Sequence, residues 1–109
     1  MSNPAKERRR SRRAEHVQGK LECRSPLATI RDISLAGVYL LLPDPPPSGE
    51  DLKLQLSLGS GERIDAHGVV RRLELGRGAF VEFTELSETG RGLLAQFLSL
   101  QFSQDDEQA

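Results

Sequence analysis

Five arginines stand close together near the start of the chain, at Arg8, Arg9, Arg10, Arg12 and Arg13. A guanidinium is a planar fork of N–H donors that matches two phosphate oxygens, and the same fork pairs with O6 and N7 of guanine. The run therefore suits a guanine nucleotide, held by its phosphate and by its base. Taken alone, the run also fits a solvated basic tail or an arm that binds nucleic acid nonspecifically.

A second polar group, Asp32, Ser34 and Gly37, spans a short expected turn between two strands. A carboxylate accepts hydrogen bonds from the N1–H and amino groups of guanine, and a hydroxyl donates to a phosphate. A glycine lets another backbone come close and is available for a positive φ. Because turns are commonly built from these residue types, the group alone is also consistent with a plain turn.

The sequence contains no constellation for catalysis or metal binding. His16 and His67 have no nearby cysteine and no His-x-x-x-His spacing, and the single Cys23 fits a small core residue. Neither a Walker loop nor a Rossmann fingerprint is present. We therefore predict a protein that is not an enzyme and that uses no metal and no cofactor.

The basic residues gather at one end of the 109-residue chain. Residues 1–31 hold nine Lys and Arg against three acids, a net charge of +6, and residues 32–109 hold six against thirteen, a net of −7, which sums to −1. This asymmetry favours an anionic partner for the basic segment. No apolar run approaches the ~18–20 residues of a membrane helix, and none follows the basic start, so we expect no membrane span, no secretory signal and a cytoplasmic location.

Short strands are the main elements that must position these residues. Apolar patterns predict strands over residues 17–23, 27–33, 38–42, 52–58, 63–73 and 79–83. Apolar residues at helical spacing over 86–98 predict a closing helix with Ser87 as its N-cap. These elements fit an all-β antiparallel barrel or sandwich with a C-terminal α-helix. We expect a flexible basic segment over 1–13, the folded domain over 14–103 and a polar tail over 104–109.

The two motifs in order, Arg9-x-x-x-Arg13 and then Asp32-x-Ser34-x-x-Gly37, resemble a PilZ domain, the bacterial receptor module for the second messenger cyclic di-GMP. The resemblance extends over roughly residues 7–102 and includes Glu7-Arg8-Arg9, Gly68-Val69-Val70-Arg71, Val81-Glu82-Phe83 and the closing helix. It implies a six-stranded antiparallel β-barrel with a C-terminal α-helix, which is one of the two architectures expected from the strand pattern.

The resemblance also implies where the ligand binds. Arg9 and Arg13 would hold its phosphates and guanine faces, while Asp32, Ser34 and Gly37 would line the barrel surface against one guanine. The dense run offers further candidates, because Arg8-x-x-x-Arg12 has the same spacing; these are Arg8, Arg10 and Arg12. One departure concerns the pocket wall: the last strand of the family usually has a glycine where this chain has Phe80.

We therefore expect a receptor for cyclic di-GMP whose basic segment orders on binding and alters a surface for an effector protein. Two alternatives stay open: a nucleic-acid-binding module that uses the basic segment, and a PilZ-like barrel that binds only protein. The acidic body and the few aromatic residues available for base stacking argue against nucleic acid. Whether one ligand or an intercalated pair binds is also open.

Overall fold

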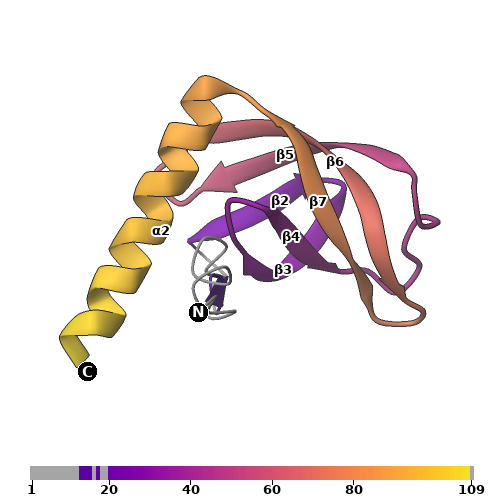
Figure 1. The fold of residues 1–109 in the computed structure, drawn as a ribbon, viewed down its shortest axis with the longest axis horizontal. Coiled ribbons are helices and arrows are strands. Elements are labelled where there is room, and N and C mark those ends of the chain that lie inside the picture. Colours follow the sequence, from indigo (N-terminus) through magenta and orange to yellow (C-terminus); the bar gives the residue numbers. More distant parts are fainter. Residues whose placement is uncertain (1–12, 16, 18–19, 109) are drawn as a thin grey trace, which may run out of the picture.

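The computed structural model describes residues 13–15, 17 and 20–108, with side chains as far as Gln101. Seven strands precede one described helix (Figure 1): β1 Ala14–Glu15, β2 Leu21–Ser25, β3 Leu27–Ile33, β4 Gly37–Leu41, β5 Asp51–Leu58, β6 Arg63–Glu74, β7 Gly78–Leu86 and α2 Glu88–Gln108. The basic segment before Arg13, with the candidates Arg8, Arg9, Arg10 and Arg12, lies outside the described residues.

The sheet closes on itself into a barrel. Its strand order is β1-β3-β2-β5-β6-β7-β4, and β4 also pairs with β3, so β2 to β7 form a closed ring. Every pairing is antiparallel. The predicted six-stranded antiparallel barrel is confirmed, with β1 as an additional short strand on β3. Closure leaves the turn between β3 and β4 fixed from two sides, because β4 also pairs with β7.

The strand predictions differ from the structure at both ends of the domain, since β7 extends to Leu86, which was predicted as part of the helical pattern, and not only to residue 83. The first predicted strand begins too early: β2 starts at Leu21, because Val17 lies before a turn in which the N–H groups of Lys20 and Leu21 both donate to its carbonyl oxygen, at 2.8 and 2.9 Å. Val17 is nevertheless fully buried, which explains why it seemed to share a strand face with Leu21. The prediction missed β1.

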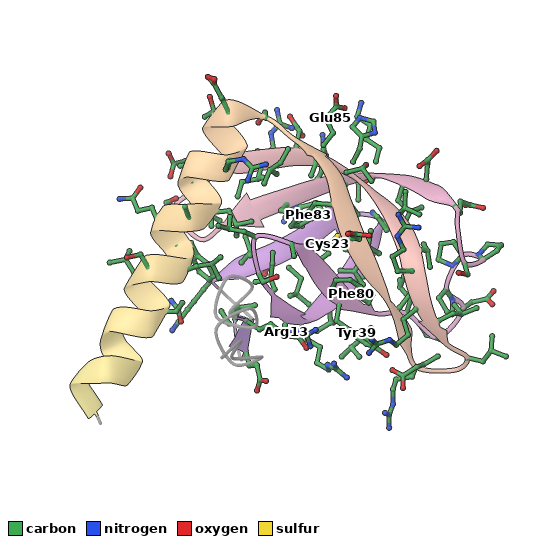
Figure 2. The ribbon with its side chains drawn as sticks, viewed as in Figure 1. Arg13, Cys23, Tyr39, Phe80, Phe83 and Glu85 are labelled. Carbon is green, nitrogen blue, oxygen red and sulfur yellow. The ribbon has the colours of Figure 1, made fainter. Side chains whose placement is uncertain are left out.

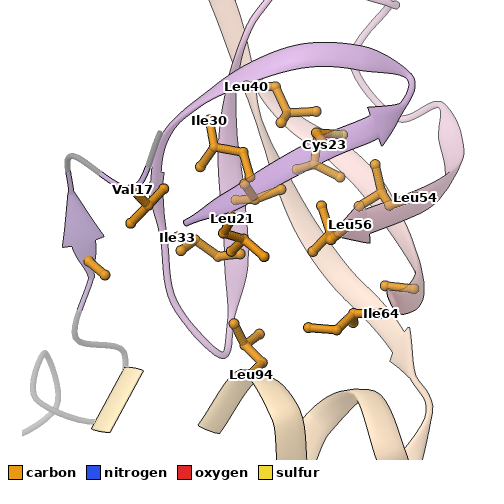
Figure 3. Close-up of a cluster of buried hydrophobic side chains, with 14 of the residues drawn as sticks. Val17, Leu21, Cys23, Ile30, Ile33, Leu40, Leu54, Leu56, Ile64 and Leu94 are labelled. Atoms are coloured by element: carbon orange, nitrogen blue, oxygen red, sulfur yellow. The ribbon is translucent and has the colours of Figure 1, made fainter. Parts of the chain in front are cut away.

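The core fills the barrel and continues to the helix (Figure 3). It includes Leu54 and Leu56 from β5, Ile64 from β6 and Leu94 from α2, each with no exposed side-chain area. The strict alternation of leucines in β5 puts one face of this strand into the core, as the sequence predicted. Cys23 is also buried in this cluster, and burial raises the pKa of its thiol to about 11.

The closing helix is capped as predicted. Ser87 Oγ accepts a hydrogen bond from the N–H of Gly90 at 3.0 Å, which satisfies one of the helix's first unpaired donors. Leu94, Phe97 and Leu98 face the barrel and are buried. The backbone of α2 continues to Gln108. None of the described helical residues forms a segment long and apolar enough to cross a membrane.

Candidate functional site

The turn between β3 and β4 is held together by Ser34. Its Oγ accepts a hydrogen bond from the N–H of Ala36 at 3.1 Å, and its own N–H donates to the carbonyl of Gly37 at 2.9 Å. The N–H of Phe83 on β7 donates to the Ala36 carbonyl at 2.9 Å, which fixes the turn to the next strand. The hydroxyl of Ser34 thus accepts one hydrogen bond within the turn, and its O–H can still donate another.

Close packing of β4 against β7, and not an unusual φ, explains why residue 37 is a glycine. The availability of a positive φ is not used there, since the positive φ values of the described glycines occur at Gly49, Gly61 and Gly76. A Cβ atom on Gly37 would lie 2.7 Å from Phe80 Cζ and closer still to the carbonyl oxygen of Val81. Real Cβ atoms essentially never approach another atom within 3.0 Å. β4 and β7 therefore pair this tightly only because residue 37 has no side chain.

Asp32 supplies a buried carboxylate at the end of β3, where the residue is only 3% exposed. Arg31 Nε donates to its Oδ2 at 2.9 Å, and Arg13 Nη1 lies 3.9 Å from its Oδ1. The second contact follows from β1, which pairs with β3 so that Glu15 stands opposite Asp32. A separation of 3.9 Å is an ion pair but not a hydrogen bond. Residues from both predicted motifs, Arg13 and Asp32, thus lie side by side.

Arg31 was not among the predicted site residues, and a β-bulge explains its position. In the pairing of β3 with β4, Ile30 is opposite Leu40 and Asp32 is opposite Tyr39, so Arg31 is the additional residue. Its guanidinium lies over the ring of Tyr39, with Cζ 3.8 Å from the ring centroid. The hydrogen bond to Asp32 raises the pKa of Arg31. Its position next to Asp32 is the one feature of the sequence that could have indicated Arg31 as a site residue.

Tyr39 is held by burial and by a hydrogen bond from its hydroxyl group. The residue is 3% exposed, and its hydroxyl donates a hydrogen bond to Glu74 on β6. Burial, followed by this hydrogen bond, raises the pKa of Tyr39. Arg77 Nη1 lies 3.9 Å from the other carboxylate oxygen of Glu74. The ring that supports Arg31 is therefore held in place by contacts with β6.

Phe80 forms a second aromatic surface beside Tyr39, since the two residues are directly opposite each other in the pairing of β4 with β7. Arg13 lies over the Phe80 ring, with Cζ 5.8 Å from its centroid (Figure 2). Two arginine–aromatic cation–π contacts thus stand next to each other, and both arginines form ion pairs with Asp32. The departure noted at residue 80 places a ring over Gly37.

The main hollows in the described part of the molecule lie away from these residues. One, of about 490 Å³, lies between β2 and β3 and includes Cys23 and Leu41 in its lining. Another, of about 410 Å³, lies between α2 and the β5–β6 turn. Neither is lined by Asp32 or Ser34. The polar site is instead a face of the barrel with exposed arginines at its edge.

The sequence model of the PilZ domain matches residues 7–100, which is most of the chain and includes both predicted motifs. The chain belongs to the PilZ domain family. This is a family of adaptor domains that bind cyclic di-GMP. Within this PilZ domain, Asp32, Ser34 and Gly37 lie at the β3–β4 turn, and Arg13 reaches them from β1.

A solved structure with the same fold is that of the Bacillus subtilis inhibitor of motility, MotI/DgrA. Its TM-score is 0.62 at 25% sequence identity, and the match covers 70% of this chain and 42% of that chain. The chain therefore corresponds to less than half of that protein. No curated protein matches the sequence.

Proposed function

We propose that this PilZ domain binds cyclic di-GMP on the face formed by Arg13, Asp32, Ser34 and Gly37, and that it acts as a cytoplasmic adaptor and not as an enzyme. The observation that supports this most directly is the position of Arg13 Nη1, 3.9 Å from Asp32 Oδ1. It joins the end of the arginine motif to the start of the aspartate–serine–glycine motif. A phosphate-binding cation and a guanine-binding acid thereby lie at one place.

The roles follow from the chemistry of each group. Asp32 accepts from the donor edge of one guanine, and the hydroxyl of Ser34 donates to a phosphate oxygen. Arg9 and Arg13 bind phosphates and the O6–N7 edge of guanine with their forks. Arg8, Arg10 and Arg12 are the further arginines of the run that can take these positions.

The free energy of binding limits how the basic segment is used. Fixing the five residues before Arg13, from Arg8 to Arg12, costs roughly 5–10 kcal/mol at about 1–2 kcal/mol per residue. Each bidentate arginine–guanine pair contributes on the order of 1–3 kcal/mol, whereas micromolar affinity needs about 8 kcal/mol net. Two such pairs are therefore too few. Phosphate charge, base stacking and contacts to the barrel must contribute as well.

The pairing of β1 with β3 confines this cost to the residues before Arg13. Ala14 and Glu15 are held on β3, so folding of the domain fixes the backbone next to Arg13. We propose that the ligand then bridges the barrel face and the rest of residues 1–13, and that the segment closes over an otherwise open site. The new surface made by the segment and the ligand would be recognised by an effector protein. The motility inhibitor among the structural neighbours is one example of a protein that carries this fold.

Calorimetric titration with cyclic di-GMP tests the site. We expect the variants Arg9→Ala, Arg13→Ala and Asp32→Ala each to weaken binding by about 5- to 150-fold, which corresponds to 1–3 kcal/mol. Arg24→Ala is the matched control, because Arg24 is an exposed arginine on β2. It stands opposite Leu27 at the start of β3, whereas Asp32 lies near the end of that strand. Undiminished binding by all three site variants would refute the assignment.

Two further measurements separate the alternatives. Binding to random duplex DNA with a steep salt dependence, and without preference for the cyclic dinucleotide, would identify a nucleic-acid module instead. For the adaptor role, we expect a pull-down with the intact chain to retain a partner protein only in the presence, or only in the absence, of the ligand. Equal retention under both conditions would contradict control of the partner surface by the ligand.

A further inference from the structure

The guanidinium of Arg31 is held by two contacts. Its Nε donates to Asp32 Oδ2 at 2.9 Å, and its Cζ lies over the Tyr39 ring, 3.8 Å from the centroid. The side chain is still 44% exposed, whereas the side chain of Asp32 is 5% exposed. Arg31 therefore covers one side of a buried carboxylate and presents the rest of its guanidinium at the surface of the site.

The fold fixes this arrangement through β3 and the two strands that hold Tyr39. Arg31 is the bulge residue of β3, and bulges next to binding sites commonly direct a side chain. Its platform, Tyr39, is buried and tied to Glu74 on β6. A side chain that is already ordered loses less conformational freedom when it forms a new hydrogen bond. Arg31 is thus a pre-positioned donor.

Its remaining donors match one edge of guanine. A guanidinium carries five N–H groups and no acceptor, and a carboxylate only accepts. With Nε used by Asp32, the terminal Nη groups of Arg31 remain as donors on a guanidinium that is bound to that carboxylate. The Watson–Crick edge of guanine has the acceptor O6 next to the donors N1–H and N2–H₂. Adenine has a donor amino group in place of O6 and an acceptor at N1. Its amino group would therefore face the donors of Arg31, and its N1 would face the acceptor oxygens of Asp32.

We propose that Arg31 determines the base specificity of the site by donating from Nη to O6 of the guanine whose N1–H and N2–H₂ are bound by Asp32. The inference rests on the proposed function, because it assigns a residue to the same ligand. It adds a contact from the barrel itself, outside both sequence motifs. Because Arg31 already donates to one oxygen of Asp32, the two side chains meet the base as one joined donor–acceptor pair.

Two comparisons of ligands test the contact. In the intact chain, Arg31→Met removes the donors but keeps most of the apolar stem, and we expect it to lower the preference for cyclic di-GMP over cyclic di-AMP by about tenfold or more, which is about 1.4 kcal/mol. Arg31→Lys keeps a positive charge beside Asp32 but cannot stack as a plane or donate from two edges, and should show the same loss. Arg24→Met, on β2 opposite the first residue of β3, should leave the preference unchanged.

A cyclic dinucleotide of 6-thioguanine distinguishes direct contact from positioning of Asp32. It keeps N1–H and N2–H₂ but has sulfur, a weaker acceptor, in place of O6. We expect it to bind the wild-type chain more weakly than cyclic di-GMP and to bind Arg31→Met equally well as cyclic di-GMP. An equal loss on sulfur substitution in both proteins, or an unchanged preference for guanine in Arg31→Met, overturns the inference while the proposed function stands. Failure of the wild type to bind cyclic di-GMP overturns both.

Discussion

Replacing Gly37 by alanine tests the tightest contact in the site without any ligand. The added Cβ would stand 2.7 Å from Phe80 Cζ and nearer still to the carbonyl oxygen of Val81. The ring can rotate away, but the carbonyl belongs to β7, whose pairing with β4 runs from Gly37 to Leu41. Relief of the clash therefore has to separate the two strands at this end.

The magnitude follows from the cost of overpacking a close contact, which is typically about 1–3 kcal/mol. For a domain of this size, 1 kcal/mol lowers Tm by roughly 4–8 °C, so we expect Gly37→Ala to lower Tm by about 5–20 °C. The assay is thermal and urea unfolding followed by circular dichroism. Gly92→Ala is the matched control, because its new Cβ would meet no atom within 4 Å and the helix gains up to ~1 kcal/mol.

The two alanine variants must move in opposite directions. A Tm for Gly37→Ala equal to or above that of the wild type would show that Val81 and Phe80 of β7 do not approach residue 37 closely enough to exclude a Cβ atom. It would also remove the steric reason for glycine in the motif and leave only a role in contacting the ligand. A fall in Tm for both variants would instead indicate a general intolerance of alanine at glycine positions.

Two other substitutions test the helix cap and the buried Tyr39 through the free energy of unfolding. Ser87→Ala removes the acceptor of the Gly90 N–H, so urea unfolding should show a loss of about 1 kcal/mol, and no loss would contradict the cap. The pKa of Tyr39 is raised above its ordinary 10.0, so the native state binds the phenol proton more tightly than the unfolded state does. The contribution of this group to the free energy of unfolding is therefore complete below pH 10.0. It is lost as the pH rises from there toward the pKa of the folded state. Unfolding measured across alkaline pH should therefore show a smaller decline for Tyr39→Phe than for the wild type, with the contribution of Cys23 common to both, and identical declines would contradict the buried position of the phenol.

Much of the barrel was predictable because its strands carry a strong local signal. Leu52, Leu54 and Leu56 alternate with polar residues, and such a period of two fits only a strand with one buried face. β1 lacks any comparable signal, since a two-residue strand has no period. It exists because Ala14 and Glu15 pair with residues far along the chain. Local patterns carry no information on such pairings.

The candidate site divides in the same way. The motif residues Asp32, Ser34 and Gly37 could be named from the sequence, and the structure places them at one turn. Of the two roles predicted for Gly37, the close approach of another backbone applies and the positive φ does not, but that β7 is the approaching strand could not be read from the sequence of β4 alone. Arg31 was missed because its position depends on the register shift between β3 and β4. Registers are set by the packing of both faces and not by one strand.

In the proposed mode of binding, two cations of the folded domain act beside the basic segment. Arg31 is held by Asp32 and Tyr39, and Arg13 is brought to the same carboxylate by β1, so folding of the domain positions both side chains. A buried carboxylate with only one cationic neighbour would lose that compensation if the neighbour turned to a phosphate. With two neighbours, Arg13 can move to the ligand while Arg31 continues to neutralise Asp32. The double contact thus allows exchange of one partner without leaving the buried charge unpaired.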